Sequence, residues 1–295
     1  MNKSTLALGC MRMASLSDIE AERVILDACD RGITLFDHAD IYGGGKSEEI
    51  FGSVLRKHPD LRDSLTIQDK CGICRGYYDL SEEHILEAVE GSLQRLGVDS
   101  LDVLLLHRPD ALMEPEEIAS AFRKLRENGK VRRFGVSNMN PAQIELIEMA
   151  APGSITVNQL QFGLAHSLLV NEGICVNTPH EQGVVRTGSV LDYCRLKKIG
   201  LQAWSPLQYG FFEGTLFSNE KYRPLTERLE AIGKEQSASV AAVAVAWILR
   251  HPAGIVPILG TMNVLHLHEL YAAESVSISR QQWYELYQLA RNPLP

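Results

Sequence analysis

Strand-like and helix-like segments alternate along the whole chain, with no linker or low-complexity stretch between them. This alternation predicts a parallel sheet whose strands are joined by helical crossovers. Eight strands are enough to close a (β/α)8 barrel, and 295 residues suit one domain of that kind. We therefore expect an α/β fold, with residues 1–295 forming a single TIM barrel domain. The expected strands cover residues 6–9, 35–37, 65–70, 103–107, 133–137, 157–161, 201–205 and 255–259.

Capping signals mark the ends of the predicted helices. Ser17 and Glu20 have the spacing of a capping box, and Pro115 and Pro141 stand where a first helical turn tolerates proline. Four helices run into a glycine that can adopt the left-handed cap: Gly32, Gly97, Gly129 and Gly200. The expected helices cover residues 18–31, 47–56, 82–96, 115–127, 141–150, 189–198, two segments within 225–250, and 280–290.

Composition narrows the classes of function. The net charge is -8, which argues against nucleic acid as a partner because phosphate binding needs a cationic face. No apolar run reaches about 18 residues, so we expect no membrane span. The six cysteines are sparse, and several lie within hydrophobic runs. We expect free thiols and a cytoplasmic protein.

Two predicted connections are longer than ordinary turns, at residues 162–188 and 208–224. Both follow the C-terminal end of a predicted strand, so both would lie at the mouth of a barrel, and loops of this length are commonly functional. The second contains Tyr209, Phe211 and Phe212, which would suit an apolar substrate pocket. The alternative is that these aromatic side chains only hold the loop in place by packing against the protein.

Three predicted strands end at, or just before, chemically useful side chains. Asp37 ends one strand, with Tyr42 a short turn later; Lys70 and His107 end the next two. In a barrel these ends meet at one face, so we expect the four side chains to share a pocket. An ammonium lowers the pKa of a nearby phenol, a carboxylate holds the ammonium, and a histidine can orient a carbonyl oxygen. Such a group would protonate an oxygen on which charge develops during hydride transfer.

Each of these residues also has a purely structural interpretation. Asp37 would cap a turn, Tyr42 would pack, Lys70 would form an ion pair at the rim, and His107 would be a hydrogen-bonded core histidine. The functional interpretation depends on their common position on successive strands.

The same segments resemble the aldo-keto reductase family. DHADIYG, at residues 37–43, is similar to its Asp-x-Ala-x-x-Tyr-Gly signature, and the lysine of QDKCG and the histidine of LLLHRPD match its other catalytic positions. Four later segments match further strand ends of the family in the right order: VRRFGVSNM, VNQLQF, LQAWSPL and PILGTMN. The resemblance spans nearly the whole chain.

The resemblance implies roles position by position. Tyr42 would be the general acid, Lys70 would tune it, Asp37 would anchor Lys70, and His107 would orient the carbonyl. The implied cofactor-binding residues are Ser137, Asn138 and Gln159 for the nicotinamide carboxamide, Trp204 for ring stacking, Ser205 and Leu207 for the pyrophosphate, Gly260, Thr261 and Asn263 beside the adenosine phosphate, and Glu269 near the ribose or adenine. No metal is implied.

The chain departs from the family pattern on the adenosine side. His266 stands near the position of an arginine that is usual in members preferring NADP, and Leu270 replaces a common asparagine. The family favours NADP(H) as cofactor, with NAD(H) as the alternative. In addition, we expect the N-terminal hairpin that usually closes the barrel bottom in this family to be short or missing.

The sequence thus predicts an enzyme, an NAD(P)H-dependent aldo-keto reductase that converts a small aldehyde or ketone to the alcohol. Two alternatives stay open. A barrel aldolase would use Lys70 as a Schiff-base nucleophile. A non-catalytic or weakly catalytic sensor would bind NADP(H) as an accessory protein.

Overall fold

The computed structural model describes residues 4–210 and 213–295. Eight parallel strands follow one another in the order β1-β12-β9-β8-β7-β6-β3-β2 and close a barrel, which confirms the predicted fold class. The chain divides into two compact units, one of Met1–Gln159 with Gly260–Val264 and one of Leu160–Leu259 with Leu265–Pro295. Whether residues 1–295 act as a single domain stays a prediction.

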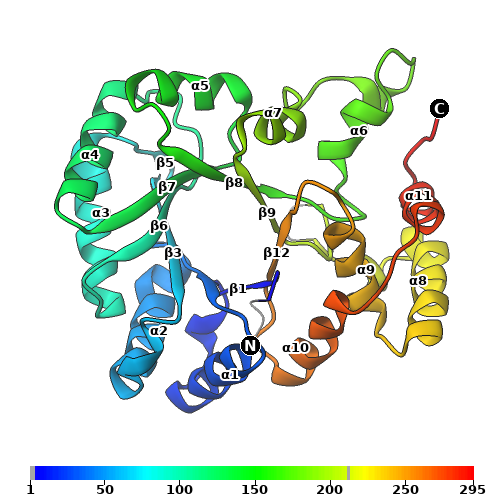
Figure 1. Cartoon of the computed structure of the whole chain (residues 1–295), viewed down its shortest axis with the longest axis horizontal. Helices are drawn as coiled ribbons and strands as arrows, with labels where there is room; N and C mark the ends of the chain where they lie inside the picture. The colour runs from blue at the N-terminus through cyan, green and yellow to red at the C-terminus, as the bar shows by residue number, and fades with distance from the viewer. Residues whose placement is uncertain (1–3, 211–212) are drawn as a thin grey trace. The chain divides into compact units, whose positions relative to one another are not determined.

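The first unit contains the strands from which the predicted catalytic residues come. Figure 1 shows helices outside the strands of this unit, as short βα crossovers require. Its strands are β1 (Ala7–Gly9), β2 (Leu35–Asp37), β3 (Thr66–Cys71), β6 (Leu101–Leu106), β7 (Val131–Ser137) and β8 (Ile155–Gln161), with β8 running just past the unit's end. Its helices are α1 (Asp18–Asp30), α2 (Lys46–Lys57), α3 (Glu82–Leu96), α4 (Pro115–Glu127) and α5 (Pro141–Ala150), and a hairpin joins β4 (Ile73–Cys74) to β5 (Tyr77–Tyr78).

Strand pairing in the first unit aligns the strand ends. Asp37 pairs with Gln68 across β2 and β3, and Lys70 pairs with Leu105 across β3 and β6. The register shifts near Gly135 of β7, where any Cβ would lie 2.5 Å from the Val157 carbonyl oxygen and 2.8 Å from Leu105 Cδ2. A glycine is therefore required there for β6, β7 and β8 to approach closely.

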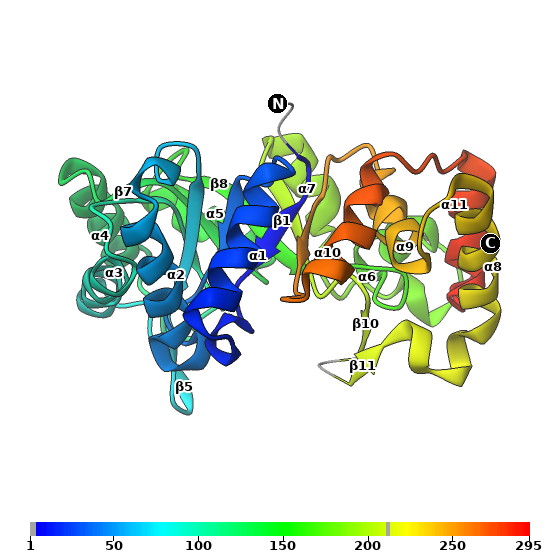
Figure 2. The same cartoon turned by 90° about the horizontal axis from the view of Figure 1, so that it is seen from below.

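The second unit is built around a tryptophan pair. Trp247 and Trp283 stack at 4.7 Å between ring centroids, and each indole N–H donates to the other's backbone carbonyl, at 3.0 and 3.1 Å. In both views α8 and α11 lie side by side (Figures 1 and 2). The elements of this unit are α6 (Leu168–Ile174), α7 (Val190–Lys197), β9 (Gly200–Trp204), β10 (Gln208–Tyr209), β11 (Gly214–Thr215), α8 (Arg223–Gln236), α9 (Val240–Leu249), β12 (Val256–Leu259), α10 (Val264–Tyr271), whose first residue falls in the first unit, and α11 (Arg280–Leu289).

Most predicted helix ends are confirmed. Ser17 forms the expected capping box, and Gly97 is the left-handed C-cap of α3. The prediction for Gly200 is wrong, because Lys198 takes the left-handed conformation at φ 59° and Gly200 already belongs to β9. The left-handed residue that ends α7 therefore lies two positions before Gly200.

The segment at residues 162–188, expected as a long loop, contains the short helix α6. Glu172, in this helix, accepts hydrogen bonds from the backbone N–H groups of Arg186, Thr187 and Ser189 and from the Thr187 hydroxyl. The buried carboxylate of Glu172 therefore holds residues 186–189 against α6.

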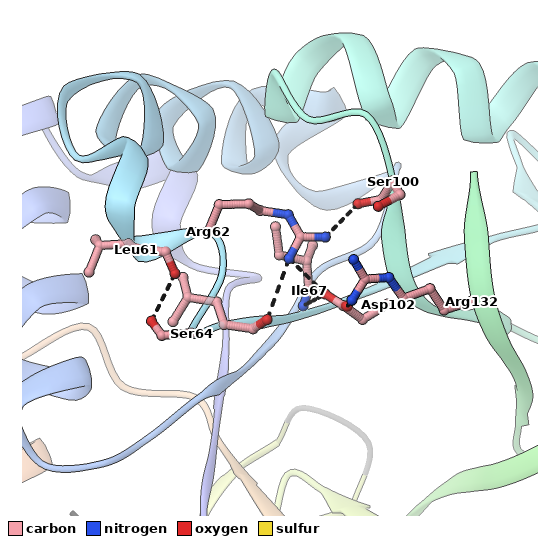
Figure 3. Close-up of polar contacts among 8 residues, drawn as sticks. Leu61, Arg62, Ser64, Ile67, Ser100, Asp102 and Arg132 are labelled. Carbon is pink, nitrogen blue, oxygen red and sulfur yellow. Dashed lines mark hydrogen bonds and ion pairs between the residues drawn. The ribbon is translucent and has the colours of Figure 1, made fainter. Parts of the chain in front are cut away.

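A buried carboxylate also joins the starts of three strands in the first unit. Asp102, at the start of β6, accepts from Arg62 Nη1 at 3.0 Å, from the Ile67 backbone N–H at 2.9 Å and from Arg132 Nη1 at 2.9 Å. Figure 3 shows Asp102 between the two guanidinium groups. Because Asp102 is 6% exposed, its charge depends on these partners rather than on water.

We predict that Asp102→Asn lowers the free energy of unfolding by about 3 kcal/mol, because two guanidinium groups lose their shared carboxylate. Urea unfolding would measure the loss. Asp99→Asn, at an exposed aspartate in the preceding loop, is the matched control and should change stability by less than about 0.5 kcal/mol. Equal losses in the two variants would contradict a supporting role for Asp102.

Candidate active site

The first unit brings Asp37 and Lys70 together in its interior. Lys70 Nζ lies 2.8 Å from Asp37 Oδ2 and donates to the His38 carbonyl oxygen at 2.5 Å, and both side chains are almost fully buried. Asp37 Oδ1 accepts from Gln68 Nε2 at 2.6 Å and from Gln159 Nε2 at 2.9 Å. The carboxylate is therefore held from β3 and β8 while it holds the ammonium, as a costly buried ion pair requires.

This pairing decides the protonation state of Lys70. Burial disfavours the ammonium, but Asp37 and then Tyr42 outweigh burial and raise the pKa of Lys70 above its ordinary value. Lys70 therefore stays charged throughout the physiological pH range.

A glycine-rich turn presents Tyr42 beside this ammonium. Tyr42 begins a 3-10 turn, Tyr42–Gly45, in which Gly43, Gly44 and Gly45 all have positive φ angles of 60°, 64° and 90°. A Cβ on Gly43 would overlap the Ala14 side chain. The turn therefore needs glycine both for its backbone conformation and for its packing.

Lys70 Nζ lies 5.0 Å from the centroid of the Tyr42 ring. Burial raises the pKa of the Tyr42 hydroxyl and Lys70 lowers it, with burial the stronger of the two. The expectation of a net lowered pKa is thus not met, although Lys70 acts in the expected direction. Desolvation of the phenol, which depends on folding, could not be weighed from the sequence.

His107 completes the group. Its ring lies 6.0 Å from that of Tyr42, edge-on at 82°. Burial, with Lys70 and Arg108, lowers the pKa of His107 well below its ordinary value, so the imidazole is neutral. A neutral imidazole can donate one N–H to an oxygen without competing with Tyr42 as an acid.

The predicted carboxamide-binding residues lie at the ends of β7 and β8. Ser137 Oγ donates to the Gln159 carbonyl oxygen at 3.0 Å, and Asn138 Nδ2 donates to Ser137 Oγ at 2.7 Å. Asn138 has a φ of 57°, which turns the chain sharply after β7. Because Gln159 also binds Asp37, the amide cluster and the ion pair form one hydrogen-bonded system.

The remaining predicted cofactor residues occupy strand ends and a loop. Trp204 is the last residue of β9, and Ser205 follows it in the left-handed region at φ 48°; Leu207 accepts from the Leu216 N–H at 2.9 Å. Glu269 is exposed on α10. The predicted pocket residues Phe211 and Phe212 lie outside the described residues.

Arg12 is a candidate binding residue that the sequence did not reveal. Its Nη1 donates to the Gly260 carbonyl oxygen at 2.7 Å, at the start of the Gly260, Thr261 and Asn263 loop. Asn263 N donates to Thr261 Oγ1 at 3.2 Å, and the loop leads into α10. An exposed guanidinium beside such a loop gives a positive site suited to a phosphate.

Comparison with known proteins identifies the family of this chain. The profile of the aldo/keto reductase family matches residues 5–291. The chain belongs to this family and is an oxidoreductase. It is 38% identical over 300 residues to a 6-dehydroglucose reductase of Agrobacterium fabrum (97% of this chain, 94% of the relative) and 36% identical over 270 residues to oxidoreductase YdhF of Escherichia coli (88% and 84%).

A solved aldo-keto reductase from Klebsiella pneumoniae, in complex with NADPH, is similar in structure. Its TM-score is 0.78 at 26% identity, covering 99% of this chain and 93% of the other.

A titratable acid, Asp40, lies beside the turn that carries Tyr42. Asp40 is half-buried, its Oδ1 makes no hydrogen bond within the described part of the chain, and its backbone N–H donates to the Lys70 carbonyl oxygen at 3.1 Å. Burial, and then Glu48, raise the pKa of Asp40 to about 6.

We predict that Asp40→Asn stabilises the protein by about 2 kcal/mol at pH 7.5 and by almost nothing at pH 4. The native state binds more protons than the unfolded state between the unfolded pKa, about 4, and the native pKa, about 6, so stability falls as pH rises through that window. Thermal unfolding at both pH values would measure this, with exposed Asp63→Asn as the control. A gain of equal size at the two pH values would contradict the assignment.

Proposed function

We propose that the protein uses NADP(H) to reduce a small aldehyde or ketone to the alcohol, with Tyr42 as the general acid. The observation that carries the proposal is the buried ammonium of Lys70, held 2.8 Å from Asp37 and facing the Tyr42 ring. A fixed positive charge beside a phenol stabilises the phenolate that remains after proton donation. His107 orients the carbonyl oxygen toward Tyr42.

The residues of the first unit suit the cofactor. The amide cluster of Ser137, Asn138 and Gln159 offers donors and acceptors for a carboxamide, and Arg12 offers positive charge beside the Gly260 loop. When bound, the cofactor supplies the hydride, and the amides would fix the rotation of its nicotinamide ring. The Klebsiella relative with NADPH supports NADP(H) over NAD(H).

The charge state of Lys70 argues against the aldolase alternative. A Schiff-base lysine must lose its proton to attack a carbonyl. Here Asp37 and Tyr42 raise the pKa of Lys70, and its Nζ is engaged by Asp37 and the His38 carbonyl. The substrate class is suggested by the Agrobacterium relative, a 6-dehydroglucose reductase, so sugar-derived aldehydes belong in the first substrate panel.

We predict that Tyr42→Phe lowers kcat by 10²- to 10⁴-fold while the Kd for NADPH changes less than about twofold, because only the proton donor is removed. Steady-state assays over a carbonyl panel and fluorescence titration with NADPH would measure the two effects. Tyr193→Phe, on α7, is the matched control. Undiminished turnover in Tyr42→Phe would exclude the mechanism, and tight NADPH binding without turnover in the parent protein would favour a cofactor sensor.

We predict that Arg12→Gln raises the Kd for NADPH about tenfold, which corresponds to about 1.4 kcal/mol, and leaves kcat at saturating NADPH nearly unchanged. The loss should shrink as salt concentration rises, because the contact is exposed. Isothermal titration would show it, with the exposed Arg133→Gln on β7 as the control. An unaltered Kd would remove Arg12 from the cofactor site.

A further inference from the structure

A second charged cluster lies behind β3, on the side away from Asp37. It contains Asp69 of β3, Glu48 of α2 and Arg95 of α3; Asp69 and Glu48 are both 0% exposed. Successive strand residues point to opposite faces, so Asp69 is directed toward the helices while its neighbour Lys70 points toward Asp37. None of these three side chains takes part in the mechanism proposed above.

Arg95 forms an ion pair with Glu48. Its Nε donates to Glu48 Oε2 at 2.7 Å, and its Nη2 donates to Ser92 Oγ at 3.3 Å. Two glycines leave room for the side chain: a Cβ would lie 2.7 Å from Arg95 Cδ at Gly45 and 2.8 Å from Nη1 at Gly91. Gly45 ends the turn that carries Tyr42, so Arg95 packs directly against this turn.

Asp69, in contrast, forms no ion pair within the part of the chain that the structure describes. Its Oδ1 accepts from the Lys70 backbone N–H at 2.9 Å, whereas its Oδ2 makes no hydrogen bond within residues 4–210 and 213–295. A buried ionised carboxylate with an unsatisfied oxygen is costly, and the cost is avoided when the group keeps its proton. Burial, and then Glu48, raise the pKa of Asp69 well above its ordinary value, which agrees with this geometry.

We propose that Glu48 and Asp69 are positioning residues: Glu48 neutralises Arg95, Asp69 remains a neutral acid, and Lys70 therefore keeps its full electrostatic effect on Tyr42. An ionised Asp69 next to Lys70 would offset part of the positive charge that stabilises the Tyr42 phenolate. This inference rests on the proposed role of Tyr42 as general acid.

Charged and titratable groups surround both Asp69 and Tyr42. Asp69 interacts with Glu48 from α2, Arg95 and Ser92 from α3, Asp40 from the turn after β2, Lys70 and Cys71 from its own strand, and Cys10 after β1. Tyr42 faces Lys70, Asp37, Cys10, His107 and Arg108.

Glu48→Gln tests the inference because it frees Arg95 to attract a new negative charge. Asp69 should then ionise, and the alkaline limb of the kcat profile, set by Tyr42, should move up by about one pH unit. The kcat near neutral pH should fall roughly threefold to tenfold, because Tyr42 becomes a weaker acid. Glu49→Gln makes the same chemical change one residue along α2, at an exposed side chain, and should leave the limb in place.

The double variant Glu48→Gln, Asp69→Asn distinguishes charge from structure. Asparagine cannot ionise, so the alkaline limb should return to within about 0.3 pH units of the parent value. Asp69→Asn alone should fold and show the parent limb, because its amide resembles the neutral acid. A lower kcat in Glu48→Gln with an unmoved limb, or no recovery in the double variant, would overturn the inference.

An infrared measurement keeps this test separate from the proposed function. A carbonyl stretch of a protonated carboxylic acid should be present in the parent at pH 8, where Asp40 is ionised, and absent from Asp69→Asn. If that band is missing in the parent, the inference fails whatever the role of Tyr42. If Tyr42→Phe retains turnover, the proposed function fails, and the infrared band still decides the protonation of Asp69.

Discussion

The buried ammonium of Lys70 is the constraint on which the rest of the site depends. A charge removed from water needs a counter-charge and hydrogen bonds from several directions. Asp37 supplies the charge, the His38 carbonyl supplies an acceptor, and Gln68 and Gln159 hold Asp37 in turn. These partners come from β2, β3 and β8, so the first unit must pair its strands in register before Lys70 can be stabilised.

Desolvation acts on each ionisable group near Lys70, and the outcome differs with the partner that each group finds. Burial and Lys70 together lower the pKa of His107, so its imidazole is neutral. At Tyr42, burial raises the pKa of the hydroxyl more than Lys70 lowers it. At Asp69, burial raises the pKa of the carboxyl more than its hydrogen bonds lower it. Lys70 has partners strong enough to overcome its own burial, as Arg95 has in Glu48. The site therefore contains the Lys70–Asp37 ion pair beside a neutral His107, and the ammonium of Lys70 gives Tyr42 a directed electrostatic environment.

The sequence predicted the strands and the four-residue group well, because both depend on local hydrophobic runs that stop at a polar residue. It missed α10, which a short loop, residues 260–263, separates from β12, and α6, which is stabilised by hydrogen bonds from Glu172 to backbone groups more than ten residues away. It also placed the cap of α7 at Gly200 rather than Lys198. For α6 the cause is a contact with distant residues, which overrides local propensity.

The adenosine side shows why a missing residue at one position need not mean a missing interaction. His266 stands where an arginine was expected, and it is exposed on α10. Arg12, which lies 248 residues before Gly260 in the sequence, instead donates to the Gly260 carbonyl at the start of the loop before α10. Electrostatic attraction depends on the position of a charge in space and not on the segment that supplies it. A positive group near the expected phosphate can thus come from the turn after β1, which no local motif in the last strand segment would indicate.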